Sequence, residues 1–239
     1  MKHTAGMLTE RCLLVCAGEE DTVPIDMQAG DFLIAVDGGL ARVLREGLCP
    51  SLILGDFDSL DPSLRSYADA REKACPSDVL RYPVEKDDTD TMAAAREGWR
   101  RGCRHFVLLD AAGGRPDHFL ANLQVLVWLA RRGASAEMRS TDRSGRRTTI
   151  RALTSGDTYL FPDTFEGTFS LLALSDTVED VTITGAHYPA EHLQLTNDYP
   201  IGISNEIHAQ TRGPEAASIR IGTGTAALIL IEGLRNTHA

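Results

Sequence analysis

Short apolar runs alternate with amphipathic segments over the first 142 residues, and this alternation constrains the fold more than any other feature of the sequence. The apolar runs predict strands at Cys12–Ala17, Phe32–Val36, Ser51–Leu54, Val79–Tyr82, His105–Leu109 and Ala136–Arg139. The intervening segments predict helices at Leu40–Glu46, Pro62–Ala70, Asp88–Arg101 and Pro116–Arg132. Because strands separated by helices pair in parallel, the sequence predicts a doubly wound α/β domain with a mainly parallel sheet.

The pattern changes at the polar segment 140–147, which is interpreted as a hairpin or a linker. Beyond it the sequence predicts no helix, and Gly, Pro, Asp and Asn separate short β-rich runs. Strands are expected at Thr148–Leu153, Thr158–Phe161, Thr168–Leu174, Val178–Thr184, Glu206–Gln210, Ala217–Ile221 and Ala226–Ile231. Closely spaced short strands are typical of a sandwich or a barrel. The sequence therefore predicts two domains, an α/β domain at residues 1–142 and an all-β sandwich at residues 143–239.

Charge and hydropathy exclude several kinds of partner. The net charge of −10 and the pI near 5.1 argue against nucleic acid, since a phosphate backbone needs a basic surface. The first eleven residues lack the apolar core of a signal peptide. The longest apolar stretch, Phe119–Ala130, is too short to span a bilayer. We therefore expect neither a nucleic acid nor a membrane as partner.

The cysteines indicate a compartment. They are odd in number, form no Cys-x-x-Cys pair and all lie in the first half of the chain: Cys12, Cys16, Cys49, Cys75 and Cys103. Reduced thiols explain this distribution better than a disulfide framework or a zinc site. We therefore expect a cytoplasmic protein.

Acidic residues gather directly after four consecutive predicted strands. The segments concerned are Asp37-Gly38-Gly39, Gly55-Asp56-Phe57-Asp58-Ser59, residues 85–90 and residues 110–118. Ligands of open α/β sheets bind outside the carboxyl ends of the strands, so these segments are expected at one edge. Carboxylate oxygens suit Mg²⁺, which takes one or two carboxylates and completes its shell with water and phosphate. The sequence therefore predicts a site for a metal ion and a phosphate group.

The segment Gly113-Gly114-Arg115-Pro116 is typical of a phosphate cradle. Glycine N–H groups and a planar guanidinium bind phosphate oxygens well, and proline favours the first position of a helix. A Gly-Gly turn before a helix is common, however, so this signal is weak when it stands alone.

Several of these polar residues also have a purely structural interpretation. Asp58 or Ser59 can cap a helix that begins near Pro62, and for Asp88 we favour a cap of the helix that follows it. Asp37-Gly38-Gly39 can be a glycine turn. A structural position is also favoured for His118, Trp99 and Trp128.

Taken together, the motifs resemble those of the thiamine pyrophosphokinase family. Asp-Gly-Gly, Gly-Asp-Phe-Asp-Ser, Glu-Lys-Asp-x-Thr-Asp and Gly-Gly-Arg-x-Asp-His occur in the family's order and spacing. The resemblance continues with Leu195-Thr196-Asn197-Asp198 and Ser204-Asn205-Glu206, and so extends over residues 36–206. The second and fourth motifs are specific in combination, whereas either one alone is not.

The resemblance implies an enzyme, a thiamine diphosphokinase. Such an enzyme transfers the terminal pyrophosphoryl group of ATP to thiamine, with Mg²⁺ as cofactor, and yields thiamine diphosphate and AMP. It also implies a homodimer with shared active sites. In that arrangement residues 1–142 bind nucleotide and metal, whereas residues 143–239 bind thiamine and form the dimer.

The resemblance assigns roles to individual residues. The implied catalytic residues are Asp56, Asp58, Asp90, Arg115 and Asp117, of which the first three are the implied metal ligands. The implied ATP-binding residues are Lys86, Thr89, Gly113, Gly114 and Arg115. The implied thiamine-binding residues are Asp37, Gly38, Asp117, Ser204 and Asn205.

Two features depart from the family pattern. Position 116 is proline, where the family usually has an aromatic residue. No tryptophan follows Trp128, whereas some members stack thiamine on a tryptophan of the C-terminal domain. Tyr188, Tyr199 and His187 are the candidates to take that place.

Two other classes of function stay open on the sequence alone. In a Mg²⁺-dependent phosphatase, Asp56 would be the nucleophile of an Asp-x-Asp pair, but this leaves the Gly-Gly-Arg-x-Asp-His motif unexplained. A non-enzymatic sensor of thiamine or nucleotide would not need so many acids, whose mutual repulsion costs stability unless a cation is bound.

Overall fold

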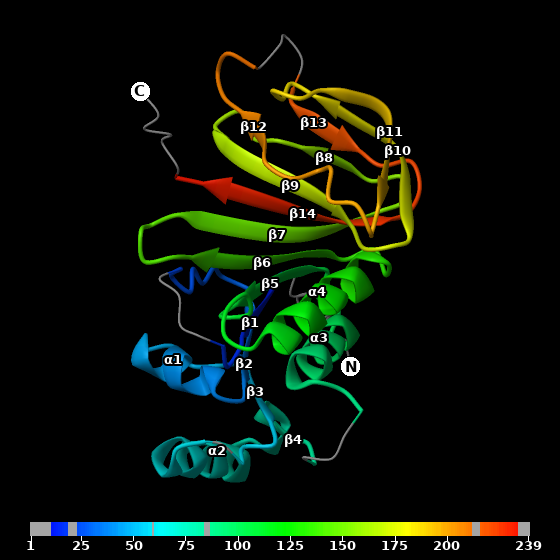
Figure 1. Ribbon diagram of the computed structural model, residues 1–239. Coiled ribbons are helices and arrows are strands. Elements are labelled where there is room, and N and C mark those ends of the chain that lie inside the picture. The colour runs from blue at the N-terminus through cyan, green and yellow to red at the C-terminus, as the bar shows by residue number, and fades with distance from the viewer. Residues whose placement is uncertain (1–10, 19–22, 59, 84–86, 212–215, 234–239) are drawn as a thin grey trace, which may run out of the picture.

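The computed structural model describes residues 11–18, 23–58, 60–83, 87–211 and 216–233, with an α/β half below and a β-sandwich half above (Figure 1). One ten-stranded sheet runs through both halves in the order β12-β9-β14-β7-β6-β5-β1-β2-β3-β4. A second sheet, β11-β10-β13-β8, lies in the upper half only. The predicted fold class, a doubly wound α/β domain followed by a β-sandwich domain, is confirmed.

The elements of the α/β half lie close to their expected positions. Its strands are β1 (Arg11–Val15), β2 (Phe32–Val36), β3 (Leu52–Gly55), β4 (Val79–Arg81), β5 (His105–Leu109) and β6 (Ser135–Thr141). Its helices are α1 (Gly39–Arg45), α2 (Pro62–Ala74), α3 (Asp90–Arg100) and α4 (Pro116–Ala130), and a short 3-10 helix spans Pro76–Asp78. No helix in the described part of the chain is long and apolar enough to cross a membrane.

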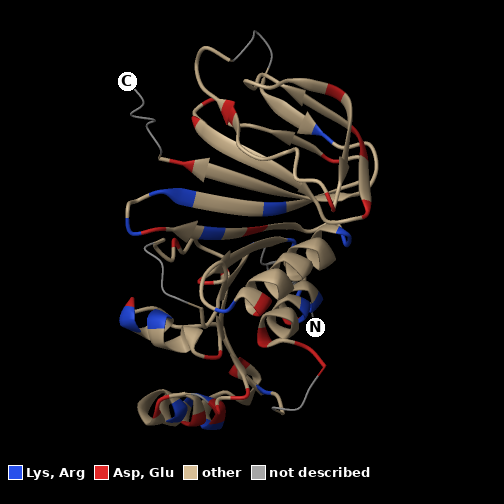
Figure 2. Cartoon of the chain, in the orientation of Figure 1, with Lys and Arg blue, Asp and Glu red and all other residues tan. Residues whose placement is uncertain are grey.

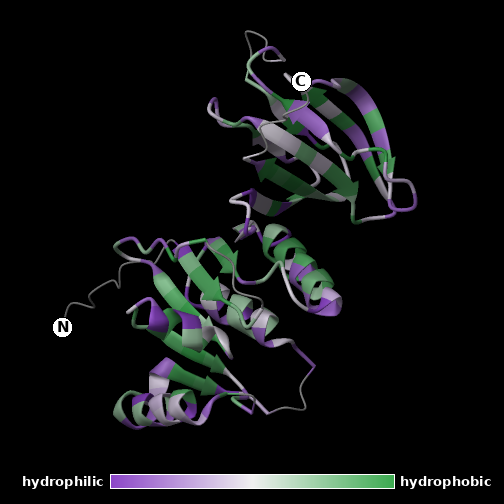
Figure 3. Ribbon diagram, turned by 60° about the vertical axis from the view of Figure 1, so that its left-hand side comes forward, coloured by the Kyte–Doolittle hydropathy of each residue, from purple (hydrophilic) through white to green (hydrophobic). Residues whose placement is uncertain are grey.

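Helices cover both faces of the parallel part of the sheet. The six strands from β4 to β6 pair in parallel, so alternate side chains enter two separate cores. Leu14, Leu54 and Leu108 belong to the core beneath α3 and α4. Leu13 and Ile53 belong to the core on the opposite face, beneath α1 and α2. The central strands β1, β2, β3 and β5 are accordingly mostly hydrophobic, whereas charged residues are frequent on the helices and on β6 (Figures 2 and 3).

The β half is a sandwich of antiparallel strands. Its strands are β7 (Arg147–Thr154), β8 (Thr158–Leu160), β9 (Gly167–Ala173), β10 (Thr177–Thr184), β11 (Ala190–Thr196), β12 (Asn205–Ile207), β13 (Ser218–Arg220) and β14 (Thr225–Glu232). A third core fills the space between the two sheets, and the rings of Phe161 and Phe169 lie 5.0 Å apart within it. The predicted domain boundary at residue 142 falls in the turn between β6 and β7, which pair antiparallel.

The structure corrects two details of the sequence interpretation. Strand β11 was not expected, because its apolar alternation is limited to Leu193 and Leu195, and only Leu195 is buried. Asp88 does not cap α3; the hydroxyl of Thr89 does, accepting a hydrogen bond from the N–H of Met92 at 3.2 Å. Asp88 instead pairs with Arg96 at 2.7 Å.

Other interpretations are confirmed. None of the five cysteines forms a disulfide bond. Trp99 and Trp128 pack edge to face, with ring centroids 6.4 Å apart, against the core beneath α3 and α4.

The continuous sheet predicts that the two halves unfold together. Phe169→Ala should destabilise the sandwich by about 3–5 kcal/mol, since it leaves a cavity at a side chain that is 1% exposed. Both tryptophans lie in the α/β half, so their fluorescence reports that half. In Phe169→Ala we therefore expect the urea midpoint of unfolding to fall by the same amount whether it is followed by tryptophan fluorescence or by circular dichroism.

Leu120→Ala, at a side chain 60% exposed, is the control and should change stability by less than about 0.5 kcal/mol. An unmoved fluorescence midpoint in Phe169→Ala would show that the halves unfold independently despite the shared sheet.

Candidate active site

A pocket of about 460 Å³ opens at the carboxyl ends of β1, β2 and β5, beside the N-termini of α3 and α4. It brings together six of the residues implied by the resemblance: Asp37, Thr89, Asp90, Gly113, Gly114 and Arg115. It is also lined by residues to which the sequence assigned no ligand role, among them Cys16, Gly18, Asp110 and Asn122. The pocket lies at the edge where open α/β sheets bind their ligands.

The chain after β1 forms one wall of this pocket and requires glycine. The N–H of Gly18 donates to the carbonyl oxygen of Asp110 at 3.1 Å. A Cβ atom at position 18 would lie 2.1 Å from that oxygen, so any larger residue would force the two strand ends apart. The exits of β1 and β5 are therefore held in contact.

A buried ion pair supports the same wall from below. The carboxylate of Asp110 is 2% exposed and accepts from the guanidinium of Arg42 on α1, whose side chain is 5% exposed. Arg42 also donates to Glu46 at 2.9 Å and to the carbonyl oxygen of Val23. Because one charge of a buried pair is costly to leave alone, this contact fixes α1 against the exit of β5.

The predicted phosphate cradle has the expected backbone. Gly114 has a φ of 79°, Arg115 is the N-cap residue of α4, and Pro116 is its first residue. Proline lacks an N–H, but at this position that N–H would have no partner within the helix. Pro116 is therefore compatible with the start of α4. The remaining N–H groups of the first turn favour an anion, and Gly113, Gly114 and Arg115 all line the pocket.

Arg115 and Asp117 are paired with each other. Nε of Arg115 donates to Oδ1 of Asp117 at 3.1 Å, and Nη2 donates to Oδ2 at 2.6 Å. Both side chains are exposed, at 72% and 63%. The hydrogen bond from Arg115 lowers the pKa of Asp117 to about 2. Asp117 is therefore ionised at neutral pH and is a weak proton acceptor.

Asp56 and Asp58 lie on a tight loop after β3, next to the pocket but not among the residues that line it. Oδ1 of Asp56 accepts from the N–H of Asp58 at 3.1 Å. Phe57, between them, is 1% exposed with a φ of 62°, a strained conformation for a bulky residue. Its burial leaves Asp56 half-buried and Asp58 exposed at the surface. Strain of this kind is typical of functional loops.

The loop adjoins Asp37, which lines the pocket. The N–H of Asp37 donates to the carbonyl oxygen of Leu54 at 2.7 Å. A Cβ atom at Gly55 would lie 3.1 Å from the Cα of Asp37. The exits of β2 and β3 are thus in contact, and the Asp56–Asp58 loop borders the pocket beside Asp37.

The structural alternative for Asp58 is wrong. The N-cap of α2 is Asp61, whose carboxylate accepts from the N–H of Ser63 at 2.9 Å. Ser59 and Lys86 lie outside the described residues. Asp90 is the first residue of α3, where the helix dipole favours a carboxylate, and it lines the pocket.

The donor set suits Mg²⁺. Asp56, Asp58 and Asp90 offer carboxylate oxygens, and Mg²⁺ uses one or two such ligands together with water and phosphate oxygens. No three His, Cys, Asp or Glu side chains of the described residues form a group arranged to hold a metal ion. A site completed by a phosphate does not require such a group.

Two of the implied thiamine residues, Ser204 and Asn205, lie in the sandwich half, and Asn205 lines a pocket there. Asn205 borders a pocket of about 380 Å³ in the sandwich half, lined mostly by apolar residues. Its amide oxygen accepts from the N–H of Tyr188 at 3.0 Å, and its amide nitrogen donates to the carbonyl oxygen of Tyr188 at 2.8 Å. Asn205 therefore positions Tyr188, which is 64% exposed. Ser204, with a φ of 60°, donates its N–H to Ser170 at 3.1 Å.

Sequence reasoning missed the residues that form the walls of the pocket. The signal for Gly18 was present, because a glycine follows the first predicted strand as it does the third. Arg42 gave no such signal, since an arginine on a predicted helix is ordinarily solvent-exposed. Asn122 in α4 donates to the carbonyl oxygen of Ala111 at 2.9 Å, a contact that only the folded chain brings about.

Comparison with known proteins agrees with this arrangement. Residues 26–138 match the family model of the thiamin pyrophosphokinase catalytic domain. Residues 157–219 match the model of the thiamin pyrophosphokinase vitamin B1 binding domain. The two models thus follow one another along the chain and together match most of it.

Individual relatives support the same assignment. A thiamine pyrophosphokinase of Bacillus subtilis is 29% identical over 174 residues, which are 73% of this chain and 77% of that protein. The crystal structure of a thiamine pyrophosphokinase from Bacillus subtilis has a TM-score of 0.78 and 24% identity, covering 94% of this chain and 100% of the other.

A thiamin pyrophosphokinase family protein from Enterococcus faecalis has a TM-score of 0.73 and 27% identity, covering 94% of this chain and 100% of the other. The fold, the pocket at the carboxyl edge of the sheet and both family models point to one conclusion. This chain belongs to the thiamin pyrophosphokinase family of diphosphotransferases.

Proposed function

We propose that this protein transfers the terminal pyrophosphoryl group of ATP to the hydroxyl oxygen of thiamine, with Mg²⁺ as cofactor, and releases thiamine diphosphate and AMP. The observation that carries the proposal is the presence, in order, of the catalytic and vitamin B1 binding domains of one family. The phosphatase and sensor alternatives account for neither domain. A cytoplasmic location stays a prediction from the composition.

The pocket of the α/β half supports the nucleotide side of this reaction. Transfer of a phosphoryl-type group needs in-line positioning and neutralisation of charge rather than covalent participation of the protein. Gly113 and Gly114 offer backbone donors at the start of α4, and Arg115 offers a planar guanidinium. Asp56, Asp58 and Asp90 are the acids that would provide the carboxylate ligands of Mg²⁺, and the bound ion would neutralise charge on the β- and γ-phosphates.

Asp117 has two roles in this proposal. It holds the guanidinium of Arg115 in one orientation before substrate binds. With a pKa of about 2, it accepts a hydrogen bond from the thiamine hydroxyl and takes the proton only late, when the oxygen is already bonding to phosphorus. The ionised carboxylate also attracts the cationic thiazolium ring.

We assign the binding of thiamine to the interface of a homodimer. Asp37 and Gly38 lie at the exit of β2, whereas Ser204 and Asn205 lie in the sandwich half beside another pocket. The rim of that second pocket exposes Tyr188, Ile201 and Ile203 by 52–64%, which suits contact with an apolar ring or another subunit. We therefore assign thiamine to a position between one subunit's acidic edge and the partner's Ser204–Asn205 loop.

Removal of one metal-ligand charge tests the Mg²⁺ assignment. Asp58→Asn should lower kcat/KM by on the order of 100-fold, since an electrostatic contribution to the transition state is lost. Asp58 is exposed, so the fold should be kept. AMP and thiamine diphosphate are measured by chromatography over a range of Mg²⁺ concentrations.

Asp61→Asn is the matched control, because asparagine caps a helix as well as aspartate does and Asp61 belongs to the same loop. It should keep wild-type activity. Equal activity of the two variants at low Mg²⁺ would remove Asp58 from the metal site.

Arg115→Lys tests the guanidinium fork. The charge is kept but the bidentate contact is lost, so kcat/KM for ATP should fall by about tenfold or more. The pKa of Asp117 should move up from about 2 toward its ordinary value, as the hydrogen bond that lowers it is lost. Kinetics and carboxyl NMR titration measure the two effects.

Arg96→Lys is the comparison, since Arg96 also pairs with an aspartate, Asp88, but lies outside the pocket. In this variant kcat/KM should be unchanged. Wild-type kinetics in Arg115→Lys would argue that Arg115 does not contact the phosphates.

Subunit mixing tests the shared site. One variant carries Asp58→Asn, and the other carries Ser204→Ala together with Asn205→Ala. The change at Asn205 also removes its two hydrogen bonds to the backbone of Tyr188. Random exchange between two-fold symmetric dimers should restore about a quarter of all sites, because half of the dimers are mixed and each mixed dimer has one intact site.

Tagged pull-down must first show exchange between subunits. If exchange occurs and the mixture is no more active than the separate variants, the site is not shared between subunits.

A further inference from the structure

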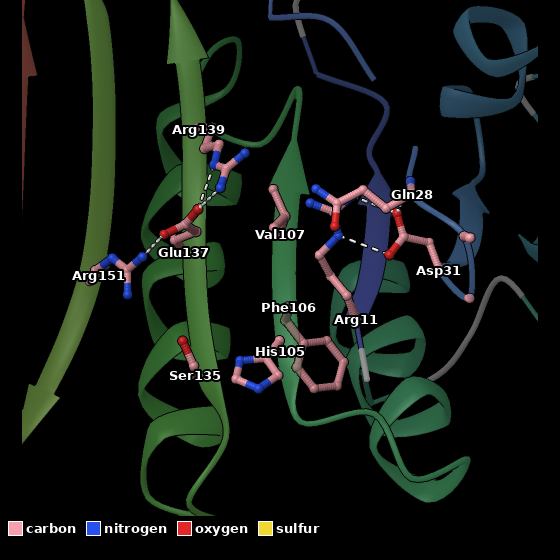
Figure 4. A pocket seen from close by; sticks show the side chains of 12 residues that line it. Arg11, Gln28, Asp31, His105, Phe106, Val107, Ser135, Glu137, Arg139 and Arg151 are labelled. Atoms are coloured by element: carbon pink, nitrogen blue, oxygen red, sulfur yellow. Dashed lines mark hydrogen bonds and ion pairs between the residues drawn. The ribbon is translucent and has the colours of Figure 1, made fainter. Parts of the chain in front are cut away.

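A second polar pocket lies on the open face of the large sheet, away from the candidate active site. Its volume is about 550 Å³, and its charged residues come from β1, β6, β7 and the chain before β2 (Figure 4). It shares no lining residue with the pocket at the carboxyl ends of the strands. Nothing in the proposed reaction uses it.

The alternation of the strands explains why this face is polar. Side chains two residues apart on a strand share a face, so Glu137 and Arg139 of β6 lie together. Glu137 and Arg151 are direct cross-strand partners in the pairing of β6 with β7. Met138 and Ile150 point to the opposite face and are buried in the core beneath α4. Basic residues accordingly mark β6 and β7, the strands that join the two halves (Figure 2).

One buried carboxylate holds two guanidinium groups in this pocket. Glu137 is 5% exposed; its Oε1 accepts from Arg139 and its Oε2 accepts from Arg151. On the other side of the pocket, Nε of Arg11 donates to Asp31 at 2.9 Å (Figure 4). The pocket thus contains three guanidinium groups and two carboxylates, an excess of one positive charge in a chain of net charge −10.

The hydrogen-bonding capacity of the cations is not exhausted. Nε of Arg151 is buried and has no hydrogen-bond partner among the described residues. An unpaired buried donor costs free energy, which an acceptor on a ligand recovers once the guanidinium turns toward it. Ser135 and His105, which lie below the two charged groups in Figure 4, add further groups able to hydrogen-bond.

The adjoining pocket of about 440 Å³ shows where an anion would not bind. Glu137, Arg139 and Arg151 line both pockets, but the adjoining one adds Asp26 and Glu232 against the single further cation Arg147. Its charges therefore balance, whereas those of the first pocket do not. The excess positive charge is confined to the pocket between Arg11 and Arg139.

We propose that this pocket is a second anion site, which binds a phosphate group through Arg139 and Arg151, with Arg11 completing its positive edge. Guanidinium groups match the geometry of phosphate oxygens and bind them in pairs. The phosphate belongs either to free inorganic phosphate or to a phosphate ester. The site is independent of the proposed transfer reaction.

Calorimetric titration at constant ionic strength tests the site, with inorganic phosphate and AMP as the two probes. The full chain should bind phosphate in wild-type form and about tenfold or more weakly in Arg139→Gln/Arg151→Gln, since each change removes charged donors. Tighter binding of AMP than of inorganic phosphate at this site identifies an ester as the ligand, whereas equal binding identifies the free anion.

Two controls separate this site from others. Arg147→Gln, on the same face of β7 but outside the pocket, should bind as wild type does. Arg115→Gln should abolish binding at the pocket of the α/β half only. Phosphate binding that is lost in Arg115→Gln and kept in Arg139→Gln/Arg151→Gln would overturn the proposal, as would no binding to the wild type.

Arg151→Lys covers the case in which the double variant does not fold. Lysine keeps the charge beside Glu137 but has no planar fork, so phosphate affinity should fall severalfold while thermal stability is kept. Unchanged phosphate affinity in a folded Arg151→Lys protein would also overturn the proposal.

Discussion

The pairing of β6 with β7 is the interaction on which the rest of the structure depends. To one side of it every strand pairs in parallel, and to the other side every strand of the same sheet is antiparallel. Glu137 and Arg151 face each other across this junction and carry opposite charges, which stabilises the register. Because a slip of one residue would turn these charges into the core beneath α4, the junction tolerates one register only.

In the parallel half, the loops that follow successive strands meet at one edge of the sheet and form the pocket there. Strand exits that are far apart in the sequence come into contact because neighbouring strands run the same way. The strand exits approach so closely that a Cβ atom at position 18, 39 or 55 would lie 3.1 Å or less from neighbouring backbone atoms, and all three positions are glycine. The buried pair of Arg42 and Asp110 then fixes α1 to the same edge. The edge is therefore preorganised by backbone packing before any substrate is present.

Local signals allowed most of the α/β half to be predicted, because its strands are continuous apolar runs and its helices carry clear ends. The features that the sequence did not predict depend mostly on contacts between residues far apart in the sequence. Strand β14, the last in the described chain, inserts between β7 and β9, and no local pattern reveals that the two predicted domains share one sheet. Strand β11 is an edge strand whose apolar alternation is limited to Leu193 and Leu195. Thr89 and Asp88 are both good caps, and only the loop geometry chooses between them.

Because one sheet runs through both halves, it also fixes the distance between the Ser204–Asn205 loop and the pocket of the α/β half. Strand β12, which begins at Asn205, is separated from β5 by β9, β14, β7 and β6. At about 4.8 Å per strand, five steps place the two strands roughly 24 Å apart within one sheet. A hinge between the halves would have to break the pairing of β6 with β7, so the Ser204–Asn205 loop cannot swing onto its own chain's pocket. If that loop serves thiamine at an acidic edge, as we propose, the edge must belong to another subunit.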